Sequence, residues 1–167
     1  KDGKTIIIKN SIVKLNGVDI DVCGNINKKY EFNTRLIGKN TSIPVVITLL
    51  DSQIIENNLS KELTYFKDID GNFDFTAHFG NKKFYGDLNL NKLSFKLIPF
   101  QNLPILLNSG KVKFTEKDIY LKDFKGFYNN RPDNKMDFSG SVRDYIKSVD
   151  TDLTGNAVVT NDFTENY

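Results

Sequence analysis

The sequence is poor in the residues that carry most enzyme and metal chemistry. Its 167 residues include one cysteine, Cys23, one histidine, His78, and no tryptophan. A single cysteine excludes an internal disulfide framework, and one cysteine with one histidine is too few for a zinc site of the usual kind. No apolar run approaches the 18 residues that a membrane-spanning helix needs. We therefore predict that no segment of this sequence crosses a membrane.

A concentration of positive charge is also missing. The formal net charge is +2, and only three of the 23 basic residues are arginines. Nucleic-acid binding normally needs clustered basic residues and arginine in particular, so we predict no nucleic-acid partner. With 39% hydrophobic and 26% charged residues, the composition is that of a globular protein. We expect one β-rich domain over residues 1–167, as a fragment of a longer protein.

The few candidate polar groups do not suggest a catalytic site. His78 alternates with apolar neighbours on a polar strand face, so a surface histidine is favoured over a base or ligand. Cys23 shares such a face with Asp19 and Asp21, acidic neighbours that disfavour a thiolate. The two aspartates could form a carboxylate pair or bind calcium, but solvated alternation explains them better. We predict no catalytic residue, metal or cofactor, and hence no enzyme.

Alternation of apolar and polar residues dominates the rest of the sequence. Residues 107–160 contain four predicted strands, each with one glycine. In the second of these strands, Ile119, Leu121 and Phe127 are assigned to one apolar row. Two further predicted hairpins cover residues 18–36 and 71–97, and residues 6–15 precede them with a break at Asn10. At Asn91 the apolar phase slips by one residue, which predicts a β-bulge.

Residues 39–65 depart from this alternation. We predict a connection over residues 39–42 and a strand over residues 43–50. A short amphipathic helix is predicted around 52–65, because Ile55, Leu59 and Leu63 recur every four residues. A second connection is expected between Pro99 and Pro104, and the most turn-rich loop is Asn129 to Lys135.

These elements predict a mainly β fold, a long antiparallel meander of eight or more strands. A helix of about 14 residues is only about 21 Å long and cannot cover such a sheet. The apolar face must therefore be hidden by a second layer, by closure into a barrel, or by curling around something apolar. The residues alone leave these alternatives open.

Two stretches of the sequence resemble a known family. They are DIDGNFDFTAHFGNKKFYGDLNL, which ends at Leu90, and the four-strand region with its motifs at Ile119 to Gly126 and Ser139 to Tyr145. Their pattern is similar to that of the AsmA-like superfamily, the AsmA/TamB/YhdP type of Gram-negative envelope protein. The resemblance implies a strongly curved, taco-like half-barrel with an apolar concave face. It also implies a location in the periplasm, with an inner-membrane anchor in a segment not present here.

The resemblance further implies phospholipid transport between the inner and outer membranes. The partners would be phospholipid acyl chains, with envelope proteins as further partners. The residues implied to line the lipid groove are the alternating apolar ones: Phe73, Phe75, Phe79, Leu88, Leu90, Val112, Phe114, Ile119, Leu121, Phe138, Val142 and Leu153. The alternative is a structural or interaction module, a closed sandwich or barrel that binds a protein or glycan through its loops.

Overall fold

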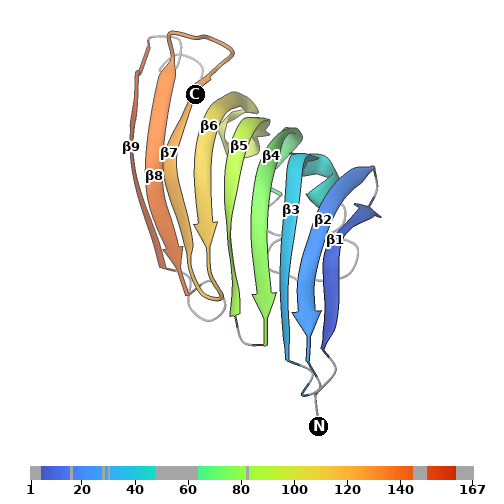
Figure 1. The fold of residues 1–167 in the computed structure, drawn as a ribbon. Helices are drawn as coiled ribbons and strands as arrows, with labels where there is room; N and C mark the ends of the chain where they lie inside the picture. The colour runs from blue at the N-terminus through green and yellow to red at the C-terminus, as the bar shows by residue number, and fades with distance from the viewer. Residues whose placement is uncertain are drawn as a thin grey trace.

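In the computed structural model, nine strands form one antiparallel sheet in which each strand pairs with its neighbours in the sequence (Figure 1). The structure describes residues 5–15, 17–27, 29, 31–47, 64–81, 83–144 and 150–160. The strands are β1 (Ile6–Leu15), β2 (Val18–Ile26), β3 (Phe32–Ser42), β4 (Phe66–Gly80), β5 (Lys83–Leu97), β6 (Leu103–Phe114), β7 (Ile119–Tyr128), β8 (Lys135–Arg143) and β9 (Asp150–Ala157). The predicted mainly β meander is confirmed. Since β1 and β9 lie at opposite ends of the strand order, the sheet is not closed.

Short turns join several neighbouring strands where the sequence predicted them. Gly17, with a φ of 83°, lies in the turn between β1 and β2, a conformation that suits glycine. Between β6 and β7, the backbone N–H of Thr115 donates to the carbonyl of Asp118 at 2.9 Å. The predicted four strands after residue 107 are β6 to β9, although β6 begins earlier, at Leu103.

Bulges interrupt five strands of the sheet. The register shifts in β1, β3, β4, β5 and β7, at or beside Asn10, Asn40, Asp68, Asn91 and Asp123, and the pairing of β6 with β7 shifts on both sides of Ser109. Asn10, Asn40 and Asp123 have positive φ, which asparagine and aspartate tolerate better than other non-glycine residues. The breaks predicted at Asn10 and Asn91 are thus confirmed, whereas those at Asn40, Asp68 and Asp123 were not predicted.

The carboxylate of Asp74 in β4 joins two of these bulges. It accepts a hydrogen bond from the backbone N–H of Asn40 at 2.7 Å and another from the side chain of Asn91 at 3.3 Å. These bonds, the backbone one first, lower the pKa of Asp74 because they stabilise its charged form. One side chain therefore fixes the irregular parts of both neighbouring strands.

The structure corrects the prediction for residues 39–50. Residues 39–42 belong to β3, and residues 43–47 are helical, so the predicted strand is wrong there. Ser42 and Pro44 are typical of a helix start, but the β-branched residues that follow them favoured a strand in the sequence. Residues 48–50, like residues 52–63 of the predicted helix, lie outside the described residues.

Two other predicted boundaries also change. Residues 64–65, the end of the predicted helix, form a turn that leads into β4. The connection expected between Pro99 and Pro104 is shorter than predicted, because Pro104 is already part of β6. A single turn of 3-10 helix, Ile98–Phe100, begins that connection.

The most buried apolar cluster lies on β6 and β7. Its members are less than a tenth exposed, and they are Leu103, Ile105, Leu107, Phe124 and Tyr128. Ala77 is the one further buried hydrophobic residue among those described. Most other apolar side chains of the sheet are only half-buried, as expected for one face of a single layer.

The Asp74 contacts predict a stability effect that depends on pH. Asp74→Asn should lower the free energy of unfolding at neutral pH, because the amide is a weaker acceptor for the Asn40 N–H. Since the pKa of Asp74 is lowered in the folded state, its contribution is present at neutral pH and lost as the pH falls through the folded pKa. The difference between the two proteins should shrink below about pH 4.

Urea denaturation at a series of pH values would measure this difference. Asp87→Asn is the matched control, because Asp87 makes only an exposed ion pair with Lys113 at 3.9 Å. An equal loss for both variants at neutral pH would contradict a special role for Asp74.

Candidate functional site

One row of directly opposed residues crosses all nine strands of the sheet. In strand order its members are Val13, Ile20, Gly38, Phe75, Leu88, Val112, Leu121, Gly140 and Leu153. Directly opposed residues of neighbouring strands lie on the same face. This central apolar row is therefore uninterrupted by any polar side chain over a width of about 38 Å, taking ~4.8 Å per strand spacing.

Further apolar rows flank the central one on the same face. One row consists of Val22, Leu36, Ala77, Gly86, Phe114, Ile119 and Val142. Another consists of Leu93, Leu107, Gly126, Met136 and Ala157. Between them, Phe124 opposes Phe138, and their rings stack with centroids 4.9 Å apart. Together these rows form what we call the apolar face.

Several glycines of the apolar face lie beneath aromatic rings. A Cβ atom on Gly38 would lie 2.1 Å from the Phe75 ring, and one on Gly110 would lie 2.6 Å from the Phe124 ring. Both distances are far below van der Waals contact. The glycines thus leave the space that the large side chains of neighbouring strands occupy.

All twelve residues predicted to line a groove lie on the apolar face. Leu153, on the edge strand β9, is 57% exposed, and the others are half-buried. By strand they are Phe73, Phe75 and Phe79 (β4), Leu88 and Leu90 (β5), Val112 and Phe114 (β6), Ile119 and Leu121 (β7), Phe138 and Val142 (β8), and Leu153 (β9).

The sequence pattern misplaced one aromatic residue in β7. Phe127 was grouped with Ile119 and Leu121, but it opposes Leu106 and Lys135 on the other face of the sheet. The bulge at Asp123 shifts the alternation, so Phe124 takes the apolar position. The signal that could have revealed this shift is an aspartate where the alternation calls for an apolar residue.

The larger cavity on the apolar face lies between the sheet and the helical segment 43–47. Its volume is about 340 Å³, at the lower end of the range for small-molecule sites. Val45 and Val46 come from the helical segment, and strands β2 to β6 supply the other lining residues: Val18, Ile20, Leu36, Thr41, Phe73, Phe75, Phe79, Leu88 and Phe114.

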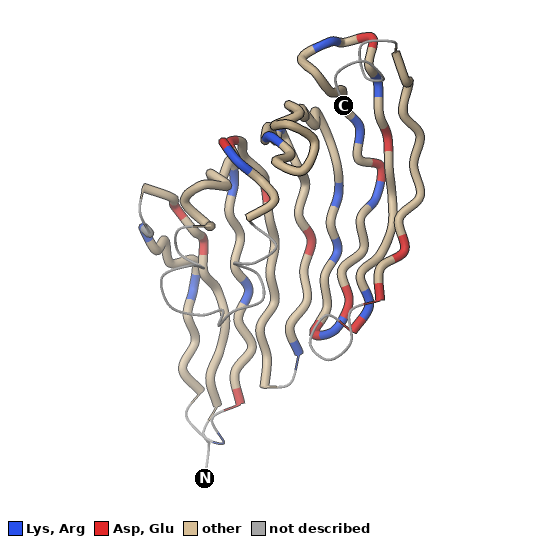
Figure 2. The backbone as a smooth tube through the Cα atoms, turned by 180° about the vertical axis from the view of Figure 1, so that it is seen from behind, with Lys and Arg blue, Asp and Glu red and all other residues tan. Residues whose placement is uncertain are grey.

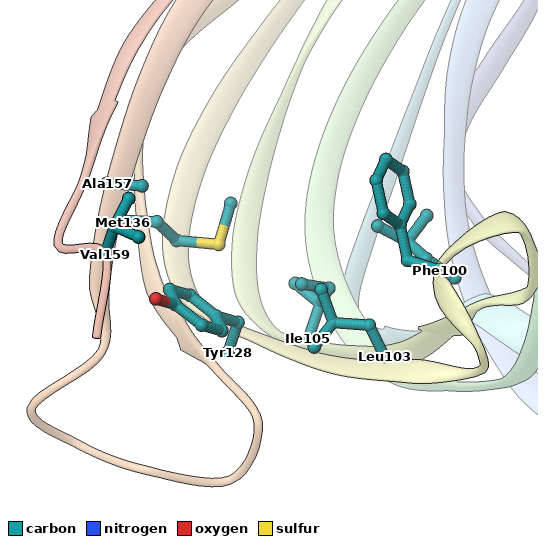
Figure 3. Close-up of a pocket in the computed structure, with 8 residues that line it drawn as sticks. Phe100, Leu103, Ile105, Tyr128, Met136, Ala157 and Val159 are labelled. Atoms are coloured by element: carbon teal, nitrogen blue, oxygen red, sulfur yellow. The ribbon is translucent and has the colours of Figure 1, made fainter. Parts of the chain in front are cut away.

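A second cavity, of about 200 Å³, lies over the buried cluster of β6 and β7 (Figure 3). In Figure 3, Met136, Tyr128 and Ile105 project into the same space from neighbouring strands. The Tyr128 hydroxyl donates a hydrogen bond to the carbonyl of Val158, so its polar end is satisfied. The cavity is lined by Leu97, Phe100, Leu103, Ile105, Tyr128, Met136, Ala157 and Val159.

The opposite face of the sheet is mainly polar. Lys14 and Asp19 form an ion pair there at 3.5 Å, and both side chains are largely exposed. Figure 2 shows acidic and basic residues interspersed along the strands. Exposed pairs of this kind contribute little to stability. Because its charged side chains are exposed, we describe this face as a solvated surface.

The candidate polar groups of the sequence do not converge. His78 lies on the polar face, where its ring stacks on Tyr85 with centroids 4.8 Å apart. Cys23 opposes Arg35 on the neighbouring strand. Within the described ranges, no group of three or more His, Cys, Asp or Glu side chains is placed to hold a metal ion.

The predicted turn-rich loop lies between β7 and β8. Asn129 and Asn130 have φ values of 55° and 56°, and Lys135 already begins β8. Asn134 is only 1% exposed, and its backbone carbonyl accepts a hydrogen bond from the N–H of Tyr128. This contact fixes the end of the loop to the end of β7.

Comparisons with protein-family models, with curated proteins and with solved structures give no match to this chain. The resemblance to the AsmA-like superfamily therefore stays a prediction from the sequence pattern. In the part of the chain that the structure describes, no helix is both long enough and apolar enough to span a membrane.

The glycine contacts on the apolar face predict the effect of adding a single methyl group. Gly38→Ala should lower the free energy of unfolding by about 1–3 kcal/mol, because the new Cβ would force the Phe75 ring to move. Thermal or urea denaturation would measure this loss.

Gly80→Ala is the matched control in the same sheet. Its nearest neighbour would be the carbonyl oxygen of Phe32 at 3.5 Å, an ordinary contact, so its effect should stay within about 0.5 kcal/mol. Equal destabilisation by both substitutions would show that the Phe75 contact does not matter.

Proposed function

We propose that the apolar face shelters lipid acyl chains, as part of an AsmA-like envelope protein that moves phospholipids between the inner and outer membranes. In this proposal the sheet is a curved, taco-like half-barrel with the apolar face inside. The observation that carries the proposal is the central apolar row, which runs from β1 to β9 without a polar side chain.

The exposure of the apolar face supports this proposal. The described strands all belong to one sheet, so they supply no second sheet to cover it. The larger predicted groove residues, such as Phe75 and Phe114, remain half-buried, and two apolar cavities lie above the sheet. An apolar surface of this extent usually marks a site for an apolar partner.

The bulges support the proposed curvature. They occur in β1, β3, β5 and β7, which run in the same direction, and also in β4, and a bulge bends its strand and increases the local twist. The strands drawn in Figure 3 bend around the residues that line the smaller cavity. Bends repeated across the sheet would turn one of its faces inward.

The energetics of lipid transfer fit such a surface. Moving an acyl chain of about sixteen carbons from a bilayer into water costs roughly 12 kcal/mol at ~0.8 kcal/mol per CH₂. A surface of Phe, Leu, Ile and Val needs only to replace the bilayer interior to remove most of this cost. It would not need to bind any chain tightly, and transport is faster if it does not.

The location follows from the same proposal. A phospholipid carrier between two membranes would lie in the periplasm, with its inner-membrane anchor in another segment. The resemblance of Ile119 to Gly126 and of Ser139 to Tyr145 to the AsmA-like pattern supports this location.

Photo-crosslinking in cells tests whether lipid occupies the apolar face. A photoreactive phenylalanine analogue at Phe75 or Phe114 should form adducts with phospholipid. The same analogue at Tyr85 or Tyr120, which are 47% and 43% exposed on the polar face, should form few. Equal labelling of both faces would contradict the proposal.

Native mass spectrometry of the gently purified protein gives an independent readout. We expect bound phospholipid with mixed acyl chains. If no lipid is found, and trimming the loop at Asn129 to Lys135 abolishes binding to a protein or glycan, the interaction-module alternative would be favoured.

A further inference from the structure

Thr41 is an unusual residue in the larger cavity. It is 1% exposed and opposes Phe73 in the sheet, and it is the one polar residue among the described residues that line this cavity. Its hydroxyl has no hydrogen-bond partner among the described residues. A buried hydroxyl without a partner destabilises the folded protein, so a partner supplied by a ligand would be favoured.

Water is a poor partner for this hydroxyl. A buried water molecule is normally held by two to four polar groups, whereas the other lining residues, such as Val45, Val46 and Leu88, are apolar. Cavities of this composition tend to stay dry and to accept apolar molecules. A ligand for this cavity should therefore be mostly hydrocarbon.

Gly38 leaves room for the Thr41 hydroxyl. A Cβ atom on Gly38 would lie 2.7 Å from Oγ1 of Thr41, close enough to crowd it. With glycine there, the buried hydroxyl and the Phe75 ring of the central apolar row share the space above Gly38. A polar atom of a ligand in the cavity would reach the hydroxyl by displacing part of this packing.

The described lining residues carry no charge, and this limits which polar atom of a ligand the Thr41 hydroxyl can bind. None of the described lining residues is basic, so an ionised carboxylate or phosphate would be buried without a counter-charge. An uncharged oxygen, such as an alcohol or an ester carbonyl, has no such cost and can hydrogen-bond to a hydroxyl.

We propose that this cavity binds a hydrocarbon chain that carries one uncharged oxygen, which hydrogen-bonds to the Thr41 hydroxyl. The proposal rests on the proposed lipid-sheltering function and adds to it a defined anchoring point. The acyl ester of a phospholipid belongs to this ligand class, and Thr41 would hold it at one depth beneath the helical segment 43–47.

Equilibrium dialysis with labelled 1-dodecanol and labelled dodecane tests the role of the hydroxyl. Thr41→Val removes the hydroxyl and keeps the shape of the side chain. The dissociation constant for dodecanol should rise roughly tenfold, while that for dodecane should stay within about twofold. Thr41→Ser, which retains the hydroxyl, should keep the preference for the alcohol.

Thr76→Val is the matched control, because Thr76 lies on the opposite face, where it opposes Ile37 and Asp87. It should change neither dissociation constant. Dodecanoate, which is ionised at neutral pH, should bind the unsubstituted protein more weakly than dodecanol. Dodecanoate binding more tightly than dodecanol would overturn the assignment of an uncharged ligand.

The experiment separates this proposal from the one on which it rests. If Thr41→Val weakens both ligands equally or neither, the hydroxyl is not an anchor, although the apolar face can still shelter lipid. If the unsubstituted protein binds neither dodecanol nor dodecane, both proposals fail.

Discussion

The register of the backbone hydrogen bonds between strands is the constraint on which the rest of this structure depends. Because side chains alternate between faces, a shift of one residue in any strand would move its apolar residues to the polar face. The central apolar row exists only because eight successive strand pairs keep compatible registers. Asp74, which joins the bulges of β3 and β5, shows that even the irregular positions are held by specific contacts.

The bulges also separate what the sequence could predict from what it could not. The slip at Asn91 was visible because Leu90 and Leu93 both lie in clear apolar alternation, so the change of phase between them stands out. In β7 the slip at Asp123 was missed, because Phe127 is apolar as well as Phe124, and Asp123 is the one residue that marks the change of phase. Alternation identifies strands well, but it identifies faces only where polar residues mark the other phase.

The region after β3 shows a second limit. Residues 43–47 are rich in β-branched side chains, and their composition favours a strand. The helix-start signals at Ser42 and Pro44 decide the local structure instead. The larger cavity could therefore not be predicted. Two of its lining residues, Val45 and Val46, belong to a helical segment for which the sequence suggested a strand. Thr41, read as part of a connection, could not be recognised as a buried hydroxyl.

The meander order has a consequence for how such a protein can change in length. Every strand of the sheet pairs only with its neighbours in the sequence, as in proteins built from stacked repeats. Folding can therefore begin at any hairpin and extend in either direction. A whole hairpin can also be gained or lost without altering the pairing of the strands that remain. The width of the sheet is thus a quantity that evolution can adjust two strands at a time, while its cross-section stays the same.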